Sequence, residues 1–164
     1  MEHFFQWLHE TPFATAIREG STLFPNIESI HVLAITLVVG TISVVDLRLI
    51  GVLWRNRKIS QLMTETLPLT WGAFAVAVIT GTLLFSSNDL KYTHNPYFLS
   101  KMVLLAVAGL NMLAFHFITS RDIATWDDAA KPPSRVRLAG AVSLLLWVGV
   151  ISTGRIIGFT MSAF

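Results

Sequence analysis

The stretch that decides the fold is residues 26–54, NIESIHVLAITLVVGTISVVDLRLIGVLW. It is apolar over most of its length and long enough to cross a bilayer as a helix. It nevertheless carries Glu28, His31 and Asp46, which fall within roughly 60° of one another on a helix that turns about 100° per residue. Because an ionisable group that faces lipid costs several kcal/mol, we expect this stripe to face protein or water.

The composition predicts an integral membrane protein. Of the 164 residues, 53% are hydrophobic and 13% are charged, whereas a soluble domain is usually about 25% charged. We predict an all-α bundle of four transmembrane helices that forms one domain over residues 1–164. The spans are expected at about residues 27–54, 68–85, 97–120 and 136–160. The absence of cysteine excludes disulfides and thiolate ligands.

Local signals predict where the helices begin. Residues 2–19 alternate aromatic and polar residues and are expected to form an amphipathic segment in the membrane interface, broken at Thr11 and Pro12. Asn26 is the predicted N-cap of the first span. Asn95 and Pro96 are predicted as the cap and first residue of the third span.

The loop charges predict the orientation. The turn after the first span and the loop after the third span lie on the same side of the membrane and hold most of the basic residues. These are Arg55, Arg57, Lys58, Arg121, Lys131, Arg135 and Arg137. By the positive-inside rule this side is cytoplasmic, so we expect a multi-pass protein of the bacterial inner membrane with both termini in the periplasm.

With this orientation, the ionisable residues of the spans fall into two layers. The outer layer contains Glu28, His31, Lys101 and Arg155. The inner layer contains Asp46 and His116, with Arg48 near them, and Asn111 lies between the layers. His31 and His116 are expected to differ in depth by roughly 20 Å at about 1.5 Å per helical residue.

Each of these residues also has a purely structural interpretation. A carboxylate such as Glu28 is stabilised in a first helical turn by the helix dipole, and Lys101 can extend to the membrane surface or pair with Glu28. His31 can be a core histidine with a satisfied hydrogen bond. Arg155 can neutralise Glu28 or a bound anionic group, and Asp46 can pair with Arg48, His116 or the basic turn.

The outer layer suggests haem or metal chemistry. Haem b requires axial ligands at one depth, with Arg or Lys near its propionates. The candidates for binding a haem here are His31, Lys101 and Arg155. A copper or other divalent site could use Glu28 and His31 with His94 from an outer loop. We therefore expect a protein of electron transfer or metal handling, acting in the bilayer as a homo-oligomer or with another membrane subunit.

Two other functions remain open. Asp46, Asn111 and His116 could form a proton or ion path, as in a transporter subunit, or all the polar groups could serve only to hold a structural scaffold together. Nothing in the sequence supports hydrolytic or nucleotide chemistry, and we assign no enzymatic reaction. The loop charges follow from topology, so we expect no nucleic-acid binding.

Four segments carry a resemblance to a known family. They are ESIHVLAITLVVGTISVVDLRLIG from residue 28, WGAFAVAVITGTLLF from residue 71, NPYFLSKMVLLAVAGLNMLAFH from residue 95 and AGAVSLLLWVGVISTGRIIGF from residue 139. Together they resemble a family of small uncharacterised bacterial inner-membrane proteins with four helices. The chain is more remotely similar to the copper-resistance D and di-haem cytochrome b membrane proteins. That similarity implies redox or copper chemistry, although this chain lacks their paired histidines.

Overall fold

The computed structural model describes residues 11, 15, 17, 20, 22–87 and 92–162. The predicted amphipathic segment, with its break at Pro12, therefore lies outside the described residues except for isolated positions. The described elements are α3 (Leu23–Ile50), α4 (Ile59–Ser87), α6 (Pro96–Phe117), the 3-10 helix η1 (Thr119–Asp122), α7 (Ile123–Trp126) and α8 (Ser134–Ser162).

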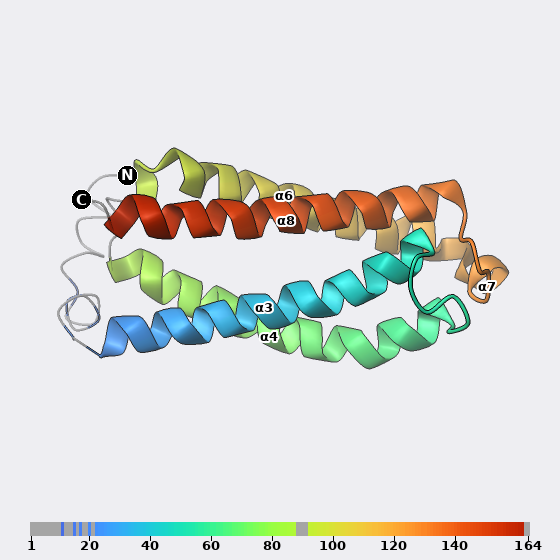
Figure 1. The fold of residues 1–164 in the computed structure, drawn as a ribbon, viewed down its shortest axis with the longest axis horizontal. Coiled ribbons are helices and arrows are strands. Elements are labelled where there is room, and N and C mark those ends of the chain that lie inside the picture. Colours follow the sequence, from blue (N-terminus) through green and yellow to red (C-terminus); the bar gives the residue numbers. More distant parts are fainter. Residues whose placement is uncertain are drawn as a thin grey trace.

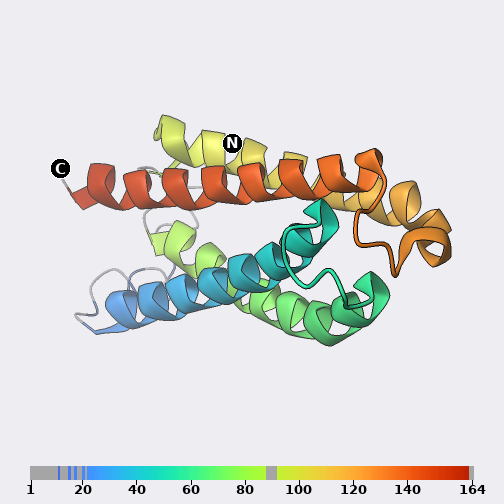
Figure 2. The same ribbon diagram turned by 45° about the vertical axis from the view of Figure 1, so that its right-hand side comes forward.

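The four long helices form two antiparallel pairs, α3 with α4 and α6 with α8 (Figures 1 and 2). The pairs are joined where α3 packs on α8. Each of the four is long and apolar enough to cross a membrane, and the described residues contain no strand. The prediction of an all-α bundle of four membrane-spanning helices is confirmed, and the chain is a multi-pass membrane protein.

Both ends of α3 differ from the sequence prediction. The helix begins at Leu23, so Asn26 lies inside it and its N–H bonds to the Thr22 carbonyl at 3.2 Å. It ends at Ile50, because Gly51 adopts a left-handed conformation with φ of 85°. The N–H groups of Gly51 and Val52 then bond back to the carbonyls of Arg48 and Leu47, which closes the helix with a Schellman-type turn.

Helix α4 runs without interruption through Pro68. The sequence instead predicted a span that begins at about residue 68. Proline removes one backbone N–H from a helix interior and usually kinks it. Here the surrounding turns stay helical, so the polar first turns and the apolar span form one 29-residue helix.

The start of α6 agrees with the prediction. The Asn95 side chain accepts a hydrogen bond from the Tyr97 N–H at 2.9 Å, and Pro96 is the first helical residue. A second bond runs from the Asn95 amide nitrogen to the Thr160 hydroxyl on α8 at 3.0 Å. One residue therefore caps α6 and ties its beginning to the end of α8.

The two ends of the bundle are built differently, and we name them by their central residues. The Arg48 end is where α3 stops, α4 starts and α7 lies, and a buried apolar cluster of Leu49, Ile59, Phe115, Trp126 and Val136 fills it. The opposite end is the His31 end. There the rings of Phe85, Tyr92 and Phe98 lie 5.3–6.0 Å apart and connect α4 to α6.

Candidate functional site

His31 lies on α3 with its imidazole half-buried against α4. Its Nδ1 atom is 2.8 Å from the hydroxyl oxygen of Thr80. A Cβ on the next residue, Gly81, would lie 3.0 Å from the His31 Cε1 atom. The small residue therefore leaves room for the ring, and Thr80 fixes its orientation.

Lys101 projects from α6 near the same level. Its side chain is half-buried, and its Nζ lies 3.8 Å from the position that a Cβ on Gly154 of α8 would occupy. The ammonium interacts electrostatically with His31. Among the described residues it has no hydrogen bond and no ion pair, so the expected pairing with Glu28 is not formed there.

The other three predicted residues of this end are exposed. The Arg155 guanidinium carbon lies 4.7 Å from the centroid of the Phe159 ring, a cation–π contact. Glu28 acts electrostatically on Tyr92, and burial together with that negative charge raises the pKa of the Tyr92 hydroxyl. His94 lies beside Thr93, with its Nδ1 3.4 Å from the Thr93 hydroxyl oxygen.

The helix ends place the predicted outer residues at similar depths. At about 1.5 Å per residue, Glu28 and Lys101 lie roughly 8 Å from the starts of α3 and α6, and His31 lies roughly 12 Å from the start of α3. Arg155 lies roughly 10 Å from the end of α8, which reaches the same end of the bundle (Figure 1). Only His31 and Lys101 of this set are linked by an interaction. Among the residues that the structure describes, no three His, Cys, Asp or Glu residues gather as metal ligands.

At the other end, Asp46 is buried between α3 and α8, with 5% of its surface exposed. Its polar neighbour is the Ser143 side chain, whereas its Oδ2 atom has no hydrogen-bond partner. Neither Arg48 nor His116 forms the ion pair with Asp46 that the sequence suggested, among the described contacts. Asp46 is therefore a buried carboxyl without a basic partner among the described residues.

The remaining residues of the predicted path lie apart from Asp46. The Asn111 amide donates to the Ala139 carbonyl at 3.1 Å and so joins α6 to α8. His116 is exposed, with its ring edge-on to Phe117 at 5.1 Å. No contact within the described part of the chain connects the three predicted residues.

Arg48 has a role that the sequence did not indicate. Its side chain is fully buried, with 0% exposure. Its Nε donates to the Arg57 carbonyl at 2.9 Å, and its Nη2 donates to the carbonyls of Asp127 and Ala129 at 3.4 and 3.2 Å. The guanidinium thus binds the loop after α3 to the loop after α7, and we call this set of bonds the Arg48 clasp.

Asp127 completes that end. Its carboxylate accepts hydrogen bonds from the Ser60 N–H at 2.7 Å and the Ser60 hydroxyl at 2.5 Å, so it caps the first turn of α4 from another part of the chain. Partial burial acts to raise the pKa of Asp127, but the bonds from Ser60 and the charge of Lys58 outweigh it and keep the pKa below its ordinary value. The sequence showed Asp127 only as one acid in a polar loop.

Comparison with known protein families gives one match. The model of a family of unknown function, DUF6644, matches residues 4–160. The chain belongs to this family. The expectation of an uncharacterised family is thereby confirmed, whereas the remoter similarity to copper-resistance D and cytochrome b proteins stays a prediction. No curated protein and no solved structure matches the chain.

In this DUF6644 protein the candidate groups lie at both ends of the bundle. The half-buried pair of His31 and Lys101 at one end can offer an imidazole nitrogen and a cation. Asp46 at the other end can offer a carboxyl oxygen. The DUF6644 match covers all of these residues.

Proposed function

We propose that this membrane protein binds haem b at the His31 end and takes part in electron transfer. The observation that carries the proposal is Lys101, a half-buried cation without an acidic partner among the described residues, which acts electrostatically on the imidazole of His31. A charge in an apolar bundle requires compensation. The propionates of a haem would supply that compensation while His31 serves as the axial ligand.

The donor set favours haem over a bound copper ion. A copper site needs several nitrogen or oxygen ligands at one point, and no such group of three forms among the described residues. Haem needs only one or two protein ligands, because its porphyrin supplies the other four. A residue of another subunit could provide the second axial ligand, and Arg155 is a further cation at that depth for the propionates.

The proposed site would lie on the periplasmic side of the bacterial inner membrane. The basic loop residues gather at the Arg48 end, which the positive-inside rule places in the cytoplasm. A haem at the opposite end could accept or donate electrons outside the cell membrane.

The test is an absorption spectrum with metal analysis of the purified protein. We expect a Soret band and a positive pyridine haemochrome assay for the wild type. His31→Ala should abolish both, and Lys101→Met should lower haem occupancy several-fold. His116→Ala is the matched control, because this exposed histidine lies at the other end and its loss should leave the spectrum unchanged. A wild-type protein with neither Soret band nor bound metal would overturn the proposal.

A specific observation favours a second candidate, a proton path that uses Asp46. The carboxyl is buried in the membrane-spanning part of α3, and one of its oxygens has no partner in the described part of the chain. Such a carboxyl is typical of groups that exchange protons in transporters. Asp46→Asn should then abolish proton flux in proteoliposomes, while Glu65→Gln, an exposed acid at the same end, should not. Equal flux in wild type and Asp46→Asn would exclude this role.

A further inference from the structure

The loop after α3 exposes three large apolar side chains in succession. Val52, Leu53 and Trp54 have 56%, 42% and 47% of their surfaces exposed. They directly precede Asn56 and three basic residues, Arg55, Arg57 and Lys58, all exposed as well. Contiguous exposed apolar groups beside charges mark an interaction surface rather than an ordinary turn.

The loop holds these side chains outward on a fixed backbone. The N–H groups of Val52 and Leu53 both bond to the Leu47 carbonyl, at 2.9 and 3.4 Å, so the chain lies against the last turn of α3. The Arg57 N–H then bonds to the Trp54 carbonyl at 2.9 Å. The exposure of these three side chains therefore does not result from a flexible loop.

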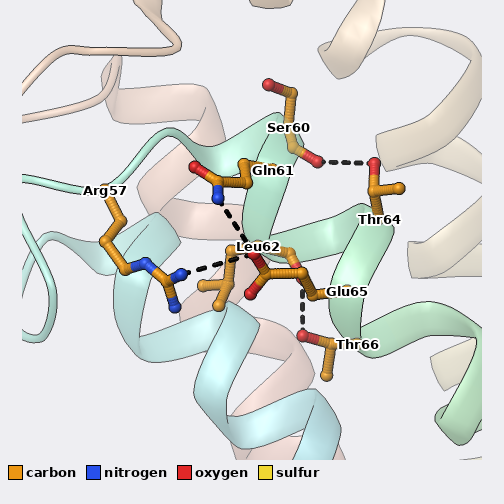
Figure 3. A network of polar contacts seen from close by, with 7 residues as sticks. All are labelled: Arg57, Ser60, Gln61, Leu62, Thr64, Glu65 and Thr66. Carbon is orange, nitrogen blue, oxygen red and sulfur yellow. Dashed lines mark hydrogen bonds and ion pairs between the residues drawn. The ribbon is translucent and has the colours of Figure 1, made fainter.

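The far end of the loop is fixed just as firmly. The Arg57 carbonyl is an acceptor of the Arg48 clasp, and the Arg57 guanidinium bonds to Glu65 at 3.3 Å, where Gln61 also donates to the same carboxylate (Figure 3). The guanidinium is thus held on the first turns of α4. Both ends of the apolar triplet are anchored to helices.

Trp54 carries backbone strain. Its φ is 46°, and it is the one residue other than glycine with positive φ in the described part of the chain. A left-handed conformation costs an L-residue with a bulky side chain free energy that glycine would not pay. Strain of this kind persists where the position of a side chain matters, and the Trp54 side chain is exposed.

We propose that residues 52–58 form a preorganised site for anionic phospholipids. The Val52–Trp54 side chains lie among the glycerol groups and upper acyl chains, and Arg55 and Lys58 contact the phosphates. The depth is appropriate, because the loop folds back on the end of a membrane-spanning helix. Indole rings and basic side chains are the groups that bind at this level of a bilayer.

The charges favour a lipid phosphate over a neutral partner. Arg55 donates to the Gly51 carbonyl through Nε at 2.6 Å and has no acidic partner among the described residues. The Lys58–Asp128 pair is exposed and 3.5 Å long, and an exposed pair of this kind is worth little. Both cations therefore stay available to an anion, and this assignment does not depend on the haem proposal.

The first experiment measures which lipids the protein retains. The protein is reconstituted in equal amounts of phosphatidylglycerol and phosphatidylcholine, extracted in mild detergent, and its bound lipids are counted by mass spectrometry. We expect enrichment of phosphatidylglycerol. Because each basic residue near the surface contributes about a fivefold preference for anionic lipid, Arg55→Gln with Lys58→Gln should lower the enrichment at least fivefold.

The matched control removes the same charge elsewhere at the same end. Arg121→Gln with Lys131→Gln should leave the enrichment within about twofold of wild type, since these exposed residues lie outside the loop. An equal fall in both double variants would show that overall charge attracts the lipid, and would overturn the loop as the site. Unchanged enrichment in the loop variant would do the same.

The second experiment follows Trp54 itself. The fluorescence of Trp54 is obtained as the difference between the wild type and Trp54→Phe. Brominated phosphatidylglycerol should quench it more strongly than brominated phosphatidylcholine. The fluorescence of Trp71, an exposed residue of α4, is obtained in the same way from Trp71→Phe and should be quenched equally by both lipids. Trp54→Gly removes the indole, so it should lose the lipid preference. Because glycine also relieves the strained backbone, the melting temperature should not fall. Equal quenching of Trp54 by the two lipids, or none, would overturn the proposal and leave the surface to another partner.

Discussion

The Arg48 end and the His31 end both place charged or titratable groups in an apolar bundle, but they satisfy them differently. At the Arg48 end, one guanidinium donates to three backbone carbonyls from two loops. At the His31 end, the Lys101 ammonium has no such partner among the described residues, and His31 bonds to the Thr80 hydroxyl and the Ala77 backbone. The first arrangement bonds two of the three guanidinium nitrogens and leaves only Nη1 without a partner among the described residues, whereas the second leaves the whole ammonium available to another group.

This difference helps to separate structural from functional charges. A buried donor that loses its partners costs free energy, so a group such as Arg48, whose Nε and Nη2 are bonded and whose Nη1 alone lacks a partner among the described residues, is explained mainly by folding. A half-buried cation without partners is not explained by folding, because burial without compensation destabilises the protein. Lys101 is therefore the better guide to function, although Arg48 is the more deeply buried.

The largest effect should follow from Arg48→Met. The substitution removes the clasp and leaves the carbonyls of Arg57, Asp127 and Ala129 without their donor. We expect the free energy of unfolding in detergent to fall by about 3 kcal/mol or more, because each buried carbonyl left without a donor costs about 1–3 kcal/mol. Lys101→Met should lower it far less or raise it. If the two variants unfold alike, the distinction between the ends is wrong.

The next effect concerns the contact between α3 and α8. A Cβ on Gly140 would lie 3.0 Å from both the Asp46 carbonyl oxygen and the Leu49 Cβ, so Gly140→Ala should push the helices apart and cost about 1–3 kcal/mol. Gly72→Ala is the control, because a Cβ there has nothing within 4 Å and alanine is the better helix former. It should be neutral or stabilising in thermal unfolding.

A smaller, pH-dependent effect should come from Asp127. Asp127→Asn weakens the cap on α4, which should cost about 1 kcal/mol at neutral pH. Because the folded pKa lies below the ordinary value of 3.8, the stabilisation is present above pH 3.8 and is lost as the pH falls through the folded value. The wild type should therefore lose more stability than Asp127→Asn on acidification below pH 4. Parallel pH profiles for the two proteins would contradict this assignment.

The sequence predicted what depends on local patterns. Apolar length sufficed for the four helices, and Asn95 with Pro96 sufficed for the start of α6, because a cap is made within one turn. The predicted ends of α3 were wrong, because the side-chain pattern did not mark where this helix stops. The apolar pattern continues through Gly51, and only its left-handed backbone stops the helix there.

The partners of the polar residues could not be predicted in the same way. Arg48 bonds to carbonyls 79 and 81 residues away, and every residue carries a carbonyl, so no side-chain pattern reveals the clasp. The sequence grouped Asp46 with His116 by depth, but depth does not fix the direction of a side chain. The structure turns Asp46 toward Ser143 and leaves His116 exposed.

The smallest effect on stability should come from Gly81→Ala, the counterpart of Gly140→Ala at the His31 end. The added Cβ would lie 3.0 Å from the His31 Cε1 atom, but a half-buried side chain can move where a packed helix backbone cannot. The gain in helix propensity, about 1 kcal/mol, should offset the cost, so the melting temperature should change by no more than about 2–3 °C. The imidazole should nevertheless shift away from Thr80, which NMR of labelled histidine would detect. A loss of stability as large as that of Gly140→Ala would mean that the His31 end is as tightly packed as the Arg48 end.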